Sequence, residues 1–114
     1  MNNVILVGYL GSDADSRTTR NDSTLTTLSL ATQRIWKDRE SGERQSQTTW
    51  HRLVTFGRLA NYAATLTKGA NLQITGELNT REYTTKDGIK KSITEIRVRR
   101  ITHLKHSPKQ EVAA

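Results

Sequence analysis

The pattern of apolar and polar residues along this chain of 114 residues is mostly that of β-strands. Apolar side chains recur at every second position or in short runs, and both arrangements are typical of strands. We expect five strands, at Val4–Leu10, Thr24–Trp36, Thr48–Phe56, Asn71–Tyr83 and Lys91–His103. The polar segments Ser12–Ser23 and Lys37–Gln47 are expected to be a loop and a flexible hairpin connection. Gly8 and Gly11 indicate a bend or a close approach of two backbones.

A helical period occurs once, directly after Gly57. Apolar residues then recur at helical spacing, at Leu59, Tyr62, Ala63 and Leu66. Lys68 and Gly69 supply a basic last turn and a glycine stop, so we expect one short helix that ends there. Tyr62 lies on the apolar face of this helix and is expected to pack in the core. In the next strand, the inward residues are expected to be Leu72, Ile74, Gly76 and Leu78.

The order of these elements is three strands, a helix and two strands, which is the order of the oligonucleotide-binding (OB) barrel. We therefore predict an all-β fold, a five-stranded Greek-key OB-fold barrel with one short helix between strands three and four. Residues 1–104 are expected to form this domain. Residues 105–114 are polar, contain the single proline, and are expected to be a short disordered C-terminal tail.

The third predicted strand carries aromatic and basic side chains on one side. Its period of two places Trp50, Arg52, Val54 and Phe56 together. A buried face would rarely include Arg52, and a solvent-exposed face would rarely include two large rings. Nucleic-acid bases stack on aromatic rings at roughly 1–3 kcal/mol each, and guanidinium groups bind phosphate. This side of the strand therefore indicates a surface for unpaired nucleic acid.

Two further rings lie beside basic residues. Trp36 stands at one end of the hairpin connection and Trp50 follows its other end, so we expect the hairpin to bring the two tryptophans together. Tyr83 lies on the polar face of its strand. The basic residues that flank the four rings are Lys37, Arg39, Arg52 and Arg81. A single tryptophan is most often packed in the core, but four aromatic rings beside four basic residues favour a binding surface.

The composition agrees with an anionic partner. The chain has 18 Lys and Arg against 11 Asp and Glu, a formal net charge of +7, and its isoelectric point is about 10.1. This excess favours nucleic acid first and an anionic membrane surface second. Cysteine is absent, which excludes disulfides and thiolate metal sites and fits a reducing cytosol. No stretch approaches the length of a membrane span.

Few residues suggest catalysis or metal binding. Asp13 and Asp15 could form the metal pair of a nuclease, but aspartate is also favoured in such loops by turn geometry alone. His103 and His106 have the spacing of weak metal ligands and lack a third candidate. His51 faces away from the aromatic side of its strand, so a packing or interface role is expected. We therefore expect no enzyme, no metal site and no cofactor.

Several segments together match the pattern of one known family. The most specific is Thr49–Ala60, and the others are Asn3–Gly11, Leu30–Thr32 with Trp36, Lys68–Gly69, Gly76–Leu78, Thr80–Arg81 and Thr94–Glu95. Over about Asn2–His103 the chain resembles the bacterial single-stranded DNA-binding protein family. The resemblance implies a cytoplasmic, nucleoid-associated homotetramer of OB barrels. Such a tetramer wraps single-stranded DNA with little sequence preference in replication, recombination and repair.

The resemblance also implies roles for individual residues. Positions that stack on bases in the family are Trp36, Trp50 and Phe56, and Tyr83 stands where many members carry tryptophan. Basic positions along the DNA path are Arg52, Arg58 and Lys68, with Lys37 and Arg39 in the flexible loop after strand two. His51 falls on a position that the family uses at the subunit interface.

The chain departs from the family pattern in three respects. Members often carry basic residues where this chain has Gln45, Thr67, Asn79 and Glu82, so we expect binding to be less resistant to salt. The helix segment is one residue shorter near Leu66. The chain ends at Gln110–Ala114 rather than in the acidic, Phe-terminated tip that recruits replication and repair proteins, so such recruitment is not expected.

Two other readings stay open at this stage. One is a primosome-type or RNA-binding OB-fold accessory protein, for which a preference for RNA would indicate recognition of the 2′-hydroxyl. The other is a metal-dependent nuclease that uses Asp13 and Asp15.

Overall fold

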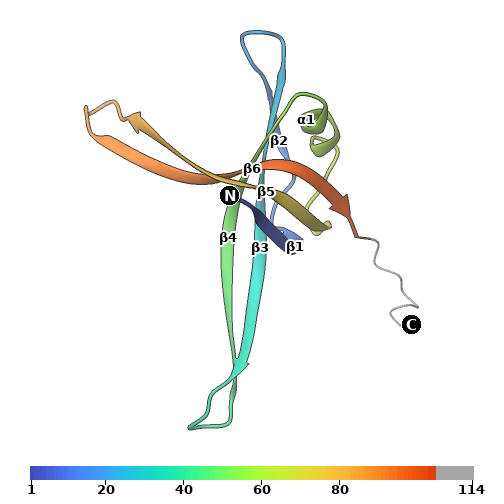
Figure 1. The fold of residues 1–114 in the computed structure, drawn as a ribbon, viewed down its shortest axis with the longest axis vertical. Helices are drawn as coiled ribbons and strands as arrows, with labels where there is room; N and C mark the ends of the chain where they lie inside the picture. Colours follow the sequence, from blue (N-terminus) through green and yellow to red (C-terminus); the bar gives the residue numbers. More distant parts are fainter. Residues whose placement is uncertain (105–114) are drawn as a thin grey trace.

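The computed structural model describes residues 1–104, which form a β-barrel with two long hairpin arms (Figure 1). The elements in chain order are β1 (Val4–Leu10), β2 (Asp15–Thr18), β3 (Thr24–Lys37), β4 (Arg44–Phe56), α1 (Gly57–Ala63), β5 (Asn71–Thr84) and β6 (Lys90–His103). The expected tail at 105–114, with His106 and Pro108, lies outside the described residues.

The five long strands close into a barrel. They follow one another in the order β1, β5, β6, β4 and β3, and β1 then pairs with β3 to complete the ring. All these pairings are antiparallel except that of β4 with β6, where Leu53 lies opposite Ile96. The helix α1 lies between the third and fourth strands of the barrel along the chain. The predicted five-stranded OB-fold barrel is therefore confirmed.

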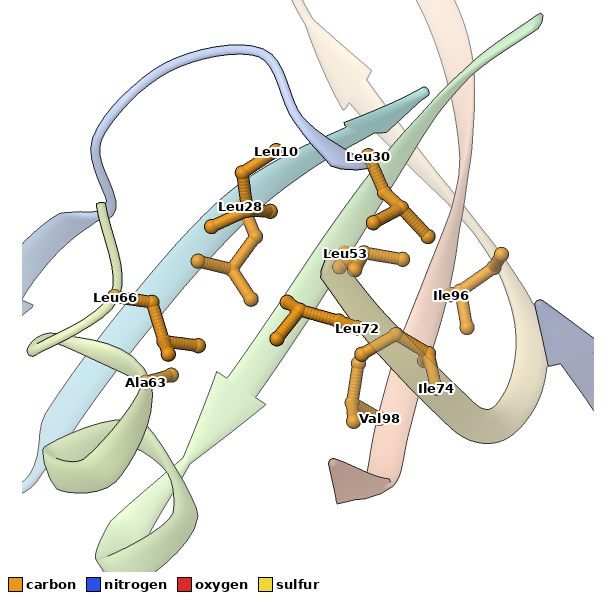
Figure 2. Close-up of a cluster of buried hydrophobic side chains, with 10 residues drawn as sticks. All are labelled: Leu10, Leu28, Leu30, Leu53, Ala63, Leu66, Leu72, Ile74, Ile96 and Val98. Carbon is orange, nitrogen blue, oxygen red and sulfur yellow. The ribbon is translucent and has the colours of Figure 1, made fainter. Parts of the chain in front are cut away.

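The core fills the barrel with leucine and isoleucine side chains (Figure 2). Leu30, Leu53, Leu72 and Ile74 have no exposed surface. Burial of each such side chain contributes about 1.5–3 kcal/mol to stability, so these inward positions hold the strands in register. Leu66, just beyond α1, covers one end of this cluster. Thr26 is also fully buried and donates a hydrogen bond of 2.8 Å to the carbonyl oxygen of Ala60, which ties α1 to β3.

Two glycines allow backbones to approach where the barrel curves. A Cβ on Gly8 would overlap the carbonyl oxygen of Ala31 in β3. A Cβ on Gly76 would overlap the carbonyl oxygen of Arg97, next to the irregularity that shifts the β5–β6 register at Thr75 and Gly76. The close approach predicted for Gly8 is therefore confirmed, and only glycine fits at either point.

Polar segments form more strand than the alternation pattern predicted. β3 and β4 remain paired out to Lys37 and Arg44, so the flexible connection shrinks to a short turn with Gly42 at φ 73°. Asp38 stabilises this turn, because its carboxylate accepts hydrogen bonds from Glu40 and Ser41. Within the predicted loop Ser12–Ser23, the four residues of β2 pair with β3. Backbone pairing extends these strands without any apolar stripe.

The helix ends earlier than predicted, at Ala63. The next turns are tighter, because the amides of Thr65 and Leu66 bond the carbonyl groups three residues before them. Tyr62 is 42% exposed, so its predicted core position is wrong. Leu78, predicted to point inward, is 52% exposed, so that prediction is wrong; it lies just beyond the register irregularity of β5 at Thr75 and Gly76.

Candidate nucleic-acid interface

The four aromatic side chains predicted to bind nucleic acid are all partly exposed. Trp50 and Phe56 on β4 are 59% and 44% exposed, while Val54 between them is 6% exposed. Trp36 on the β3–β4 arm is 41% exposed, and Tyr83 on the β5–β6 arm is 42% exposed. Aromatic rings with this much free surface are available to stack on planar ligands.

A groove runs beside β4 and brings several predicted residues together. Two adjoining hollows of about 490 Å³ and 250 Å³ share the lining residues Asp15, Thr27 and Arg52. Phe56 lines the larger hollow and Trp50 the smaller one. We call this channel the β2 groove, since Asp15 and the residues after it in β2 form one wall. Its basic lining residues are Arg17, Arg52, Arg81 and Arg97.

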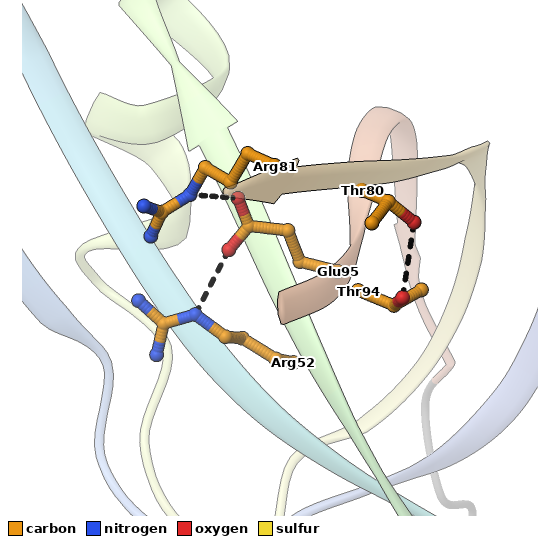
Figure 3. Close-up of polar contacts among 5 residues, drawn as sticks. All are labelled: Arg52, Thr80, Arg81, Thr94 and Glu95. Atoms are coloured by element: carbon orange, nitrogen blue, oxygen red, sulfur yellow. Dashed lines mark hydrogen bonds and ion pairs between the residues drawn. The ribbon is translucent and has the colours of Figure 1, made fainter. Parts of the chain in front are cut away.

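Arg52 and Arg81 are joined through a carboxylate that sequence reasoning missed (Figure 3). The Nε atoms of Arg52 and Arg81 each donate a hydrogen bond of 2.9 Å to Glu95, one to each carboxylate oxygen. Glu95 on β6 is only 6% exposed. Its burial by itself raises the pKa of the carboxyl group, but the hydrogen bonds and charges of Arg81 and Arg52 outweigh burial and leave the pKa below 4.5.

The rings of the groove have neighbours that fix one side of each. A Cβ on Gly11 would overlap the Cζ3 atom of Trp50, so the indole lies against the backbone at the end of β1. The guanidinium carbon of Arg97 lies 5.0 Å from the centre of the Phe56 ring. Cations at this distance attract the face of an aromatic ring. Arg97 is therefore a basic residue of the groove, and it was not among the predicted site residues.

Other predicted residues lie away from the groove. Trp36 faces Gln45 in the β3–β4 ladder while Trp50 faces Ala31, so they are five ladder positions apart. At about 3.3 Å per position this is roughly 16 Å along the ribbon, and the prediction that the hairpin brings the two tryptophans together is wrong. The remaining basic residues of the predicted site are exposed. Lys37 and Arg39 lie on the β3–β4 arm, Arg58 lies on α1, and Lys68 follows α1.

His51 neighbours Trp50 on β4 but belongs to the opposite side of the strand. Its Nε2 atom lies 2.8 Å from the hydroxyl oxygen of Thr32, and burial lowers the pKa of the imidazole. Thr32 lines a hollow beside β1, whose Val7 and Tyr9 are 52% and 54% exposed. His51 thus lies near an exposed apolar edge of the barrel.

The two aspartates considered as a nuclease pair have other contacts. Asp13 accepts a hydrogen bond of 2.8 Å from the backbone amide of Lys68, and Asp15 lies 3.6 Å from Arg17. Within residues 1–104, no three His, Asp or Glu side chains gather as a metal ion would require. No helix in this same part of the chain has the length and apolar character needed to cross a membrane.

Comparison with known proteins agrees with this geometry. Residues 1–104 match the model of the single-strand binding protein family. Among solved structures, an SSB from Plasmodium falciparum in complex with ssDNA is similar, with a TM-score of 0.83 and 31% identity over 92% of this chain and 96% of that chain. A deletion mutant of the single-stranded DNA-binding protein from Thermus aquaticus has a TM-score of 0.80 and 34% identity, over 92% of this chain and 51% of that one.

Proposed function

Because the chain belongs to the single-strand binding protein family, we propose that it binds single-stranded DNA on the β4 side of its barrel. Binding would involve no covalent step. The protein would coat unpaired DNA, keep it from re-pairing and shield it from nucleases during replication, recombination and repair.

The observation that carries this proposal is the strip of Trp50, Arg52 and Phe56 along the β2 groove. Exposed rings alternate there with a guanidinium group, so bases can stack while phosphate is neutralised. Each stacked base would contribute about 1–3 kcal/mol. Every base has a face to stack and every nucleotide has a phosphate, so little sequence preference is expected.

The path of the strand would continue beyond the groove along both arms. On the β3–β4 arm, Trp36 would stack on a base and Lys37 and Arg39 would bind phosphates. Tyr83 would stack on the β5–β6 arm, where Arg81 lies two residues before it. Arg58 and Lys68 would bind phosphates on the helix side of the barrel. The exposure of these side chains and the net charge of +7 support this path.

We also propose that the protein assembles as a homotetramer. Ile5, Val7 and Tyr9 on the outer face of β1 are 60%, 52% and 54% exposed, an apolar strip that a second copy would cover. His51 would contribute to a subunit contact from the adjoining edge. A binder of this kind would act at the bacterial nucleoid in the cytoplasm.

Equilibrium binding to labelled oligonucleotides tests the proposal. Fluorescence anisotropy would compare oligo-dT, a duplex of the same length and a matched RNA at several salt concentrations. We expect oligo-dT to bind most tightly, with affinity that falls as salt rises. Equal affinity for the duplex would contradict the proposal, and a preference for the RNA would point to 2′-hydroxyl recognition instead.

A further inference from the structure

A buried carboxylate beneath a proposed phosphate-binding surface requires an explanation. Glu95 adds a negative charge to a groove that is proposed to attract a polyanion, and it is 6% exposed. Burying a charge costs free energy unless partners compensate for it. The compensation comes from two strands, because Arg52 lies on β4 and Arg81 on β5 (Figure 3).

The geometry of these contacts determines what stays free. Each arginine uses its Nε atom to reach Glu95, at 2.9 Å in both cases. Figure 3 shows the terminal nitrogens of both guanidinium groups directed away from the carboxylate. The side chains of Arg52 and Arg81 are 46% and 50% exposed, and both line the larger hollow of the β2 groove. Glu95 therefore occupies the Nε atoms and leaves the terminal nitrogens of both arginines, which can bind phosphate, unused.

We propose that Glu95 is a positioning residue that holds Arg52 and Arg81 ready for phosphate. A free arginine side chain loses conformational freedom when it binds a ligand, and a side chain already fixed at Nε loses less. Glu95 makes no contact with the DNA in this role. The proposal rests on the proposed function, since it assigns Glu95 to the same binding surface.

Net charge alone predicts the opposite effect, which makes the proposal testable. Removing a carboxylate makes the groove more positive, and a groove that acted only through its charge would bind DNA more tightly. Positioning predicts weaker binding, because without both carboxylate oxygens at least one guanidinium group becomes mobile. The direction of the change in affinity therefore separates the two accounts.

The experiment compares Glu95→Gln with Glu82→Gln in the full chain. Glu82 is an exposed residue of β5 next to Arg81, so its substitution makes the same change of net charge without touching the Arg52–Glu95–Arg81 cluster. Binding of labelled oligo-dT would be measured by anisotropy. We expect Glu95→Gln to bind about tenfold more weakly. Glu82→Gln should bind as well as the wild type or more tightly. Equal or tighter binding by Glu95→Gln would overturn the proposal.

A second variant and a measurement on the wild type test the proposal even if Glu95→Gln does not fold. Glu95→Asp keeps the charge but retracts the carboxylate by one methylene, and it should also weaken binding. In the wild type, NMR signals of the Arg52 and Arg81 Nε–H groups should exchange with water more slowly than that of Arg39 on the arm. Equally fast exchange would show that the arginines are not held. If the wild type itself fails to bind oligo-dT, the proposed function fails, whatever the variants do.

Discussion

At the scale of single residues, the position of the Trp50 ring depends on Gly11. The indole is 59% exposed and rests against a backbone that has no side chain at this point. The sequence pattern predicted an exposed Trp50, as the structure has it, but gave no indication of the surface beneath the ring. That surface belongs to the end of β1, about forty residues earlier in the chain, and only tertiary structure brings the two together.

Substitution of Gly11 by alanine should weaken DNA binding without unfolding the barrel. The added Cβ would overlap the Cζ3 atom of Trp50 and force the exposed ring to move. Losing one stacked base corresponds to about 1–3 kcal/mol of binding free energy. Anisotropy with oligo-dT would measure the loss, with circular dichroism as the check on folding. Unchanged affinity in Gly11→Ala would show that the ring position does not matter.

The stability of the protein in acid should depend on Glu95. Because the pKa of this carboxyl group is lowered from 4.5 in the folded state, its ionised form stabilises the fold above pH 4.5. That contribution is lost as the pH falls from 4.5 through the folded-state pKa. Thermal melts from pH 7 to pH 2 should therefore show a smaller fall in melting temperature for Glu95→Gln than for the wild type. Parallel losses in the two proteins would mean that the carboxylate is not stabilised by its arginines.

At the scale of elements, the two hairpin arms extend the proposed binding surface beyond the barrel (Figure 1). The β3–β4 arm remains paired out to Lys37 and Arg44, so Lys37 stands at the end of a ladder and Arg39 lies in the short turn that closes it. An ordered arm presents charges in a fixed direction, which lowers the entropic cost of binding.

Replacing Lys37 and Arg39 together by glutamine should reduce the salt dependence of binding. Each phosphate contact on a single strand contributes about 0.7 to the slope of log K against log salt, so the double variant should lose about 1.4. Titrations of oligo-dT at four or more salt concentrations would give the slope. Both side chains are exposed, so the melting temperature should stay the same. An unaltered slope would place the DNA path away from this arm.

Sequence reasoning predicted the elements better than their ends. All five barrel strands were predicted. Buried leucine and isoleucine residues such as Leu28, Leu30 and Ile74 recur at every second position, and this alternation is visible in the sequence. The strand β2 was missed because its residues are all exposed and only its pairing with β3 makes it a strand. The helix was extended past Ala63 because Leu66 is buried, although it packs from a tighter turn.

The sequence predicted only the part of the candidate site that lies on a single strand. Trp50, Arg52 and Phe56 lie close together on one strand, so a local pattern identified them. Glu95 and Arg97 joined the site only through the β4–β6 and β5–β6 pairings, which no local pattern reveals. In the sequence, Glu95 appears only as part of the family-matching segment Thr94–Glu95, without a role of its own.

At the scale of the whole molecule, the proposed assembly surface and the proposed binding groove lie on different strands of the barrel. The β2 groove lies beside β4, and the exposed apolar strip of Ile5, Val7 and Tyr9 lies on β1. Subunits could therefore associate through β1 while each keeps its groove open. A strand could then pass from one subunit to the next, which would raise the total affinity through effective concentration.

Light scattering on the wild type and Val7→Arg tests this arrangement. The wild type should have about four times the chain mass of 12.9 kDa, as the proposed tetramer requires. An arginine in the apolar strip would bury an unpaired charge on assembly, so Val7→Arg should give a smaller species. The exposed Thr84→Arg on the β5–β6 arm is the control and should keep the wild-type mass. A wild type that scatters as a monomer would contradict the account of the β1 surface.

The most direct test of the central claim is the fluorescence of Trp50 during DNA binding. The chain has two tryptophans, so Trp36→Phe leaves Trp50 as the single indole. Oligo-dT would be added to this variant while anisotropy of the labelled oligonucleotide reports binding. If bases stack on Trp50 and Phe56 of β4, Trp50 fluorescence should be strongly quenched. The quenching should saturate at the same ratio of DNA to protein as the anisotropy. Full binding with unchanged Trp50 fluorescence would show that the DNA does not lie on this face.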